Sequence, residues 1–439
     1  MLKQHHPEYP AHDCDVLVIG GGPAGSTAAA LLAERGYGVT LFERERHPRF
    51  HIGESLLPAN LQLFERLGVQ EQMRAIGMEK FGAEFNSPLH AQSQSFEFGD
   101  AWDKSMPLAY QVRRSEFDEI LLRNAAAKGA SVIEGCRVTG VEFTDNPRGA
   151  VVHATRDDGV VETRRPRFVV DASGRDTFVA SKLKLKRRNT KHNSAAVYGH
   201  FSGAQRLTGK EEGHISLFWF DHGWFWFIPL RDGATSVGVT TWPYYMKTRG
   251  ARPLEQFFLD TIAMCPALAA RLANASLMSQ VEATGNFSYA ADRTHGPNYL
   301  LVGDAYTFID PVFSSGVLLA MNGAFVAVDT IDACLKNPAQ AKQALAAFDK
   351  TMRHGPKEFS WFIYRVTNPT MRHLFMEPAN PLRVREALLS LLAGDIFGKT
   401  PIWRSLFALK ALYYAMSLVN LRRTITAWQR RKKNIMPVK

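Results

Sequence analysis

The stretch DVLVIGGGPAGSTAAALLAERGYGVTLFE, from Asp15 to Glu43, decides the fold of this 439-residue chain. A short apolar run, VLVI, is followed by a glycine cluster and then by an Ala/Leu-rich segment with helical spacing. A second β-like run, GVTLF, follows and ends at the acidic Glu43. This order predicts a strand, a tight turn, a helix and a second strand, which together form a βαβ unit.

The glycines of this unit have the spacing G-x-G-x-x-G at Gly20, Gly22 and Gly25. The first permits a tight turn, the second lets the backbone approach a pyrophosphate, and the third lets the helix pack against the strands. The helix then directs its free N–H groups and its positive dipole end at the phosphates. Glu43 is placed to accept a hydrogen bond from a ribose hydroxyl. The unit predicts a bound adenine dinucleotide, and a glycine-rich turn without a ligand is the alternative.

Length and composition, with 46% hydrophobic and 22% charged residues, fit a globular protein of two or three lobes. The four cysteines have no C-x-x-C spacing, so neither a disulfide framework nor a metal site is expected. The N-terminus lacks the apolar core of a signal peptide, and no uninterrupted apolar run reaches about 18 residues. These features predict a cytoplasmic protein.

The formal net charge of +11 is concentrated in KLKLKRRNTK, residues 182–191, and in residues 422–439, which hold seven cations and no acid. Such patches attract nucleic acid, anionic lipid or an acidic protein partner. Nucleic acid is not expected, because no recognition-module signature accompanies the charge. A merely solvated face is the alternative for both patches.

The rest of the chain indicates further sheets and a helical end. Alternating residues predict strands over 81–110 and a meander over 138–164, and more strand-like runs lie between 192 and 288. We predict an α/β protein with a Rossmann-like dinucleotide-binding domain, a β-sheet substrate domain and a C-terminal helical region. The predicted ranges are 10–80, 105–185 and 289–340 for the first domain, 81–104 and 186–288 for the second, and 341–439 for the helical region.

Two further elements accompany the glycine turn: VVDASGR, ending at Arg175, and LLVGDAYTFIDP, residues 300–311. Asp304, at the end of a buried strand, is positioned to hydrogen-bond a ribitol hydroxyl. The order and distances of the three elements resemble the flavoprotein aromatic-hydroxylase superfamily, which implies bound FAD. No second G-x-G-x-x-G unit follows, so reduced FAD is expected from a partner flavin reductase. The resemblance assigns to the cofactor Gly20, Gly22, Pro23, Ala24, Gly25, Glu43, Asp171, Gly174, Gly303 and Asp304.

The run GWFWFIP, residues 223–229, matches W-x-W-x-I-P, the signature of flavin-dependent halogenases. On a strand with period two, Trp224, Trp226 and Ile228 share one face. In the family this indole wall is thought to deny an organic substrate direct access to the reactive flavin, which places Trp224 and Trp226 among the catalytic residues. An aromatic strand in an ordinary core is the alternative.

Two segments are similar to the halogenase branch that acts on phenols or pyrroles, often held on a carrier protein. They are RFHIGESLLP, residues 49–58, and IDPVFSSGV, residues 309–317. The second lies at a predicted helix N-terminus, where free N–H groups can hold an anion. By its position in the motif, the backbone of Ser315 and Gly316 is the halide site. Tryptophan halogenases have a glutamate at the position of Phe313, so free tryptophan is not the expected substrate. The resemblance adds Ser55, Arg114, Pro311, Gly316 and Val317 to the cofactor contacts.

Lys80, in GMEKFGAEF, matches the context of the catalytic lysine of this family. An ammonium on an apolar wall loses hydration, so its pKa falls toward the range where it donates to hypohalous acid or is itself halogenated. A surface lysine that extends from the end of a helix is the alternative.

The C-terminal segment PIWRSLFALKALYYAMSLVNLRRTITAWQRRKK combines apolar residues with a basic end. It predicts a helix packed across the substrate lobe, and peripheral membrane contact through an interfacial helix is the alternative.

These patterns together predict an FAD-dependent halogenase that uses reduced FAD, O2 and chloride or bromide on an electron-rich phenol or pyrrole, free or bound to an acidic carrier protein. A flavin monooxygenase is the second interpretation. A flavin-binding accessory protein without turnover is the third.

Overall fold

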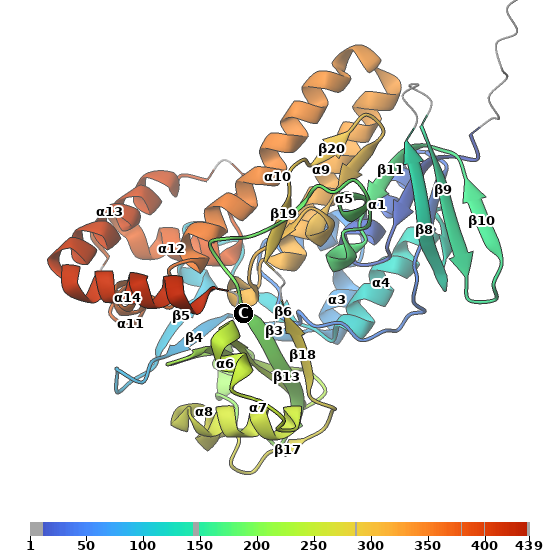
Figure 1. Ribbon diagram of the computed structural model, residues 1–439. Coiled ribbons are helices and arrows are strands. Elements are labelled where there is room, and N and C mark those ends of the chain that lie inside the picture. Colours follow the sequence, from blue (N-terminus) through green and yellow to red (C-terminus); the bar gives the residue numbers. More distant parts are fainter. Residues whose placement is uncertain (1–11, 144–148, 286–287, 379, 399, 437–439) are drawn as a thin grey trace, which may run out of the picture.

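The computed structural model describes residues 12–143, 149–285, 288–378, 380–398 and 400–436 (Figure 1). Its central sheet has six strands, parallel except at one edge pair. Val16, Leu17 and Val18 of the central strand are fully buried, as expected for a parallel strand covered on both faces. In spatial order the strands are β20 (His295–Gly296), β21 (Tyr299–Leu301), β11 (Pro166–Asp171), β1 (Cys14–Ile19), β2 (Val39–Phe42) and β7 (Ser131–Ile133).

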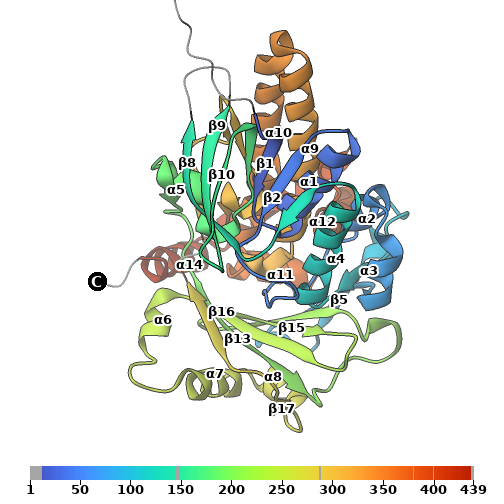
Figure 2. The same ribbon diagram turned by 90° about the vertical axis from the view of Figure 1, so that its right-hand side faces the viewer.

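Helices and a small meander cover this sheet. Helix α1 (Pro23–Glu34) packs against α4 (Arg114–Ala127) and α9 (Gly316–Lys336), and its alanines allow the close approach. The meander of β8 (Cys136–Phe143), β9 (Ala150–Arg156) and β10 (Val161–Arg164) packs on β2 and β11 (Figure 2). The strand, helix and strand expected between residues 15 and 43 are therefore present as β1, α1 and β2. The α/β fold with a Rossmann-like domain is confirmed.

A second sheet of eight strands is apolar on both faces. The face that carries Trp224, Trp226 and Ile228 packs toward the C-terminal helices, and the face that carries Phe225 and Phe227 packs on two helices of the 253–274 insert. The insert forms α7 (Leu254–Ala263) and α8 (Pro266–Arg271). The strands are β17 (Ser276–Leu277), β13 (Ala195–Ser202), β16 (Thr235–Thr241), β15 (Gly223–Pro229), β14 (Ile215–Phe220), β4 (Gly82–Asn86) and β5 (Gln94–Glu97), with β18 (Glu282–Gly285) paired to β13.

The C-terminal region is helical, as predicted. Its helices are α10 (Ala341–Ile363), α11 (Pro369–Met376), α12 (Val384–Ala393), α13 (Trp403–Val419) and α14 (Leu421–Asn434) (Figure 1, orange to red). Within the described part of the chain, one helix, α9, is long and apolar enough to cross a membrane by length and composition alone. It packs between α1 and α10 inside the protein, so its apolar character is that of a core helix.

Short elements join these layers. Strands β3 (Met78–Lys80) and β6 (Ala109–Gln111) form a separate antiparallel pair. Lys80 is the last residue of β3. The remaining helices are α2 (Asn60–Leu67), α3 (Gln70–Ile76), α5 (Phe178–Lys182) and α6 (Pro243–Lys247).

The structure departs from the sequence-based expectations at two places. The basic run at 186–188 forms β12 (Lys186–Arg188), which pairs with β19 (Tyr289–Ala291) beside β22 (Thr307–Phe308), so these residues join strands assigned to the other predicted domain. The C-terminal segment is two helices rather than one. It breaks at Asn420, whose backbone leaves the helical region with φ −101° and ψ 39° and whose side-chain amide donates to the Met416 carbonyl.

Candidate active site

A cavity of about 720 Å³ runs from the glycine turn after β1 to the tryptophan face of β15. Gly20, Gly22, Pro23 and Ala24 line one end, and Trp224, Trp226 and Ile228 line the other. The carboxyl ends of parallel strands meet there, at the edge where such sheets bind nucleotides. The cavity therefore connects the predicted phosphate site with the predicted indole wall.

The glycine turn has the geometry that a pyrophosphate requires. A Cβ on Gly22 would meet only Arg49 Nη2, at 3.6 Å, so its backbone faces open cavity. A Cβ on Gly25 would lie 1.9 Å from the Gly20 carbonyl oxygen, and Gly20 itself has a φ of +101°. Among the described residues no side chain caps α1, so its first N–H groups are available to phosphate. The turn fits the group that the sequence predicts.

The acid at the end of β2 is held by the same turn. Glu43 Oε2 accepts from the Gly21 N–H at 2.6 Å and Oε1 from the Glu45 N–H at 2.9 Å. Its carboxylate still lines the cavity, where its remaining lone pairs face the predicted ribose. Arg49, which sequence reasoning did not select, also lines the cavity beside Gly22. Its position in the quoted RFHIGESLLP motif was the available signal.

Two of the predicted cofactor residues act on protein groups instead. Asp171 lies outside the cavity lining, because its two carboxylate oxygens accept from the Ser173 and Val179 N–H groups at 3.0 and 2.8 Å. Arg114 lines the cavity, but its guanidinium is bound to the buried Asp118 and to the Ile52 carbonyl oxygen. Asp171 shapes the 172–179 turn, and its contact with the cofactor stays a prediction. Arg114 fixes the turn at 52–55 from behind.

The strand end after β21 places a second acid at the cavity. Asp304 lines both this cavity and a smaller one, and burial raises its pKa to about 6. Gly303, which precedes it, has a φ of +56°. A Cβ at this position would lie 3.1 Å from the Cβ of Ala320 on α9. Gly174 lines the large cavity on the neighbouring turn. These positions agree with a polar tail such as ribitol lying across the strand ends.

The indole wall is present as the period-two pattern predicted. Trp224 and Trp226 lie on one face of β15 with ring centroids 6.0 Å apart, and both are almost fully buried. Trp226 Nε1 donates to Ser236 Oγ at 3.3 Å, which fixes the indole plane. Tyr198 of β13, which sequence reasoning did not select, joins the wall at 6.1 Å from Trp226.

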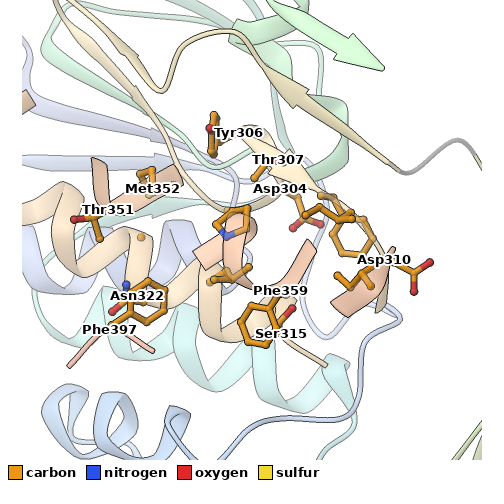
Figure 3. A pocket seen from close by; sticks show the side chains of 18 residues that line it. Asp304, Tyr306, Thr307, Asp310, Ser315, Asn322, Thr351, Met352, Phe359 and Phe397 are labelled. Atoms are coloured by element: carbon orange, nitrogen blue, oxygen red, sulfur yellow. The ribbon is translucent and has the colours of Figure 1, made fainter. Parts of the chain in front are cut away.

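A small cavity of about 40 Å³ adjoins the loop before α9 (Figure 3). Pro311, Gly316 and Val317 line the large cavity, whereas Ser315 lines the small one and Gly316 borders both. Ser315 is the N-terminal flanking residue of α9, and no described side chain caps that helix end. Free N–H groups at this end are suited to a halide ion. Phe313 is buried and contacts the rings of Phe362 and Phe375, in place of a glutamate.

Lys80 does not line the cavity but is hydrogen-bonded to Ser55, which does. Its ammonium donates to Ser55 Oγ and to the Leu56 carbonyl, both at 2.9 Å, and lies 5.3 Å from the Phe98 ring centroid. Ser55 lines the large cavity, but Lys80 does not. The side chain is 1% exposed, and burial lowers its pKa to about 7. The expectation of a surface lysine is thus excluded, and the ammonium is poised to lose its proton near neutral pH.

One cluster of metal-binding side-chain types lies elsewhere. The ligand atoms of His90, His373 and Glu377 are within 4.8 Å of one another on partly exposed side chains that line neither cavity. Sequence analysis predicted no metal and did not bring these residues together, because His90 lies more than two hundred positions from the other two along the chain.

The fold and the cavity define an FAD-dependent oxidoreductase, and the comparisons with known proteins agree. The family described as "FAD binding domain" matches residues 13–355. The chain is 31% identical over 409 residues to the 1H-pyrrole-2-carbonyl-(peptidyl-carrier protein) chlorinase of Pseudomonas fluorescens, covering 88% of this chain and 90% of that relative. It is 34% identical over 344 residues to a tryptophan 2-halogenase of Chondromyces crocatus, covering 76% of this chain and 64% of that relative.

A solved structure agrees with these sequence matches. The myxobacterial chondrochloren halogenase CndH superposes with a TM-score of 0.77 at 33% identity, over 89% of this chain and 92% of that one. The chain belongs to the flavin-dependent halogenases. The predicted FAD cofactor, the halide and the enzyme class are confirmed at this level.

Proposed function

We propose that this enzyme halogenates an electron-rich phenol or pyrrole, using reduced FAD delivered by a separate reductase in the cytoplasm. One observation carries the proposal: a lysine with a pKa of about 7 is hydrogen-bonded to Ser55, which lines a cavity shared by the phosphate turn and the indole wall. A pyrrole substrate agrees with the chlorinase relative, and the buried Phe313 replaces the acid that tryptophan halogenases use on indole.

The residues of the site divide the chemistry. Bound reduced FAD supplies hypohalous acid: O2, one halide and one proton are converted to hypohalous acid and water as FADH2 is oxidised to FAD. Ser315 and Gly316 hold the halide with backbone N–H groups. Trp224 and Trp226 exclude water and organic substrate from the reactive edge. Lys80 holds the hypohalous acid for attack by the ring, which takes the halogen and releases water.

The decisive experiment for the proposal is product analysis. The purified protein is incubated with a flavin reductase, NADH, O2 and bromide and with free and carrier-bound phenols and pyrroles, and products are identified by mass spectrometry. We expect a bromine isotope pattern on one substrate class. Oxygen insertion without halogen, with NADH consumed by the protein alone, establishes the monooxygenase instead. Flavin binding without substrate-dependent O2 consumption, even with the reductase present, establishes the accessory protein.

We propose that the substrate is presented on an acidic acyl-carrier protein that docks at β12. Arg187 and Arg188 are exposed there, and the neighbouring Lys186 donates to the carbonyl of Arg175, a residue that lines the cavity. The basic strand therefore adjoins the cavity. Such a surface speeds encounter with an anionic helix and orients docking, an effect that fades with salt.

Charge reversal at Arg187 and Arg188 (R187E/R188E) is expected to slow turnover of a carrier-bound substrate about ten-fold at low salt and to leave a small free phenol unaffected. The matched control reverses Lys342 and Lys350, two exposed lysines of α10. Turnover is measured as kcat/KM at two salt concentrations. Equal effects on both substrates, or none on either, contradict the docking proposal and leave the halogenase assignment intact.

We also propose that α14 contacts an anionic membrane surface. Leu421, Ile425 and Trp428 are 51%, 45% and 60% exposed, and their spacing of four and three residues places them on one face of the helix. The sequence from residue 396 onward has no acidic residue. An apolar stripe on a basic helix is the pattern of an interfacial helix, with the indole at the depth of the lipid headgroups.

Vesicle sedimentation tests this contact. We expect binding to phosphatidylserine-containing vesicles and little binding to phosphatidylcholine alone. Replacement of Ile425 and Trp428 by aspartate is expected to weaken binding at least ten-fold, because burying each large apolar side chain contributes about 1.5–3 kcal/mol. The control is Leu89→Asp, which changes a leucine that is 72% exposed on the β4–β5 connection. If the wild-type protein does not sediment with anionic vesicles, the proposed membrane contact is wrong.

A further inference from the structure

Arg431 of helix α14 is half-buried and contacts the segment at residues 191–192. Its Nη2 donates to the Lys191 carbonyl oxygen at 3.0 Å and contacts His192 Nδ1 at 3.2 Å. The guanidinium also lies 5.6 Å from the Trp242 ring centroid. Burial lowers the pKa of Arg431 to about 10, so it carries its charge at neutral pH. A half-buried arginine with these contacts is held in place, unlike the exposed cations of the same helix.

The arginine selects one tautomer of His192. A guanidinium has only donors, so His192 Nδ1 accepts in this hydrogen bond, which assigns the ring proton to Nε2. His192 Nε2 lies 2.7 Å from Asp310 Oδ2, to which it therefore donates. Both side chains are nearly inaccessible, at 3% and 1% exposure. The result is a buried chain of oriented hydrogen bonds from Arg431 through His192 to Asp310.

Asp310 links this chain of hydrogen bonds to the loop before α9. Its Oδ1 accepts from the Val312 N–H at 3.1 Å, and its Oδ2 also accepts from Ser194 Oγ at 3.2 Å. The capped turn continues through Ser314, which has a φ of +55°, to the start of α9. A non-glycine residue in this region is held only where its surroundings demand it. Asp310 therefore determines where the N–H groups of Ser315 and Gly316 point.

We propose that Arg431 is a positioning residue for the halide site: through His192 and Asp310 it holds the 310–316 loop in the conformation that binds halide. The inference rests on the proposed halide site at Ser315 and Gly316. It assigns a function in the reaction to a helix that touches neither cavity, because no α14 residue lines them among those that the structure describes. Helix α14 therefore has two faces. Leu421, Ile425 and Trp428 are exposed on one face, and Arg431 contacts the protein on the other.

Steady-state kinetics separates this role from simple stability. Arg431→Met removes the donor but keeps the length of the side chain, and we expect the KM for halide to rise about ten-fold, the size of one lost charge-assisted hydrogen bond. We expect kcat and the dissociation constant of FAD to change by less than about two-fold. Arg431→Lys, which keeps a donor and the charge, restores most of the halide affinity. The matched control is Lys433→Met, which removes one exposed charge from the same helix.

A spectroscopic readout tests the hydrogen-bond chain without turnover. In ¹⁵N-histidine-labelled protein, with His192 assigned by a His192→Asn variant, the wild type is expected to show the Nε2–H tautomer. Arg431→Met is expected to shift the His192 Nδ1 resonance, and Lys433→Met leaves it unchanged. A thermal unfolding midpoint recorded for each variant reports any loss of helix docking.

The outcomes distinguish the inference from the function it rests on. An unchanged halide KM in a folded Arg431→Met protein, or an unchanged His192 resonance, overturns the positioning role. A lowered unfolding midpoint without a change in halide KM assigns Arg431 to stability alone and also overturns it. If the wild type shows no halide dependence, the halide site itself fails, and the histidine spectrum still decides whether Arg431 sets the tautomer.

Discussion

Lys80→Met is expected to abolish halogenation, by about 10³-fold or more, while FAD binding and reductase-dependent O2 consumption continue. The reason is spatial: the proposed function places the formation of hypohalous acid at the flavin, whereas Lys80 lies behind Ser55 and is proposed only to receive it. Methionine fills the volume of a buried lysine in an apolar setting, so the fold is expected to persist. The measurement is product mass spectrometry beside O2 uptake.

The control for this prediction is Lys210→Met, because Lys210 also lies over an aromatic ring, at 5.0 Å from Phe81, but on an exposed side chain. It is expected to retain full activity. Halogenation by Lys80→Met at the wild-type rate shows that the assignment of Lys80 is wrong. A variant that fails to bind FAD reports a structural defect, and Lys80→Arg then provides the test with a retained cation.

The pKa of Lys80, about 7, makes the protonation state of the lysine measurable. If the ammonium holds hypohalous acid by a hydrogen bond, kcat falls as the pH rises through 7. If the neutral amine is halogenated first, kcat rises over the same range. A flavin-independent assay with added hypohalous acid and substrate isolates this step from the oxidation of FAD.

The second large effect is expected for Gly22→Val. This substitution is expected to weaken FAD binding about 100-fold, whereas the protein is expected to remain folded. The backbone of Gly22 is extended, with a φ of −76°, and a Cβ there meets nothing closer than 3.6 Å. Valine therefore fits the protein but fills the space where the backbone N–H groups reach the pyrophosphate. The loss of two charge-assisted hydrogen bonds accounts for about 3 kcal/mol. Flavin absorbance after purification and titration with FAD measure the effect.

The contrasting variant is Gly25→Val. Its Cβ would lie 1.9 Å from the Gly20 carbonyl oxygen, so it is expected to disrupt the packing of α1 on β1 and to lower solubility and the unfolding midpoint. The pair separates a loss of cofactor from a loss of fold. A yellow, fully loaded Gly22→Val protein removes the basis for placing the pyrophosphate at this turn.

The local features of this protein were predictable because they depend on neighbours in the chain. The βαβ unit follows from an apolar run, three glycines and a helical period, and the structure has β1, α1 and β2 where they were expected. The face shared by Trp224, Trp226 and Ile228 follows from period two alone. FAD and the halogenase family followed from the same motifs, since each motif is a contiguous run of residues.

Features that no periodicity or motif specifies were decided only by the folded structure. Asp171 ends a buried strand, as a cofactor-binding acid would, but folding places the Ser173 and Val179 N–H groups against its carboxylate. The pKa of Lys80 depends on complete burial, which a β-strand pattern of three residues does not specify. Asn420 divides a segment that reads as one continuous helix.

The chain from Arg431 to His192 to Asp310 joins residues 239 and 118 positions apart. Read along the sequence, Arg431 is one of seven cations in a basic tail, and nothing local distinguishes it from its neighbours. Composition and motifs determined the fold class, the cofactor and the family. Only the folded structure decided that one of these cations is half-buried against His192 and Trp242, because burial is a property of the surfaces that folding brings together and not of the residue that carries the charge.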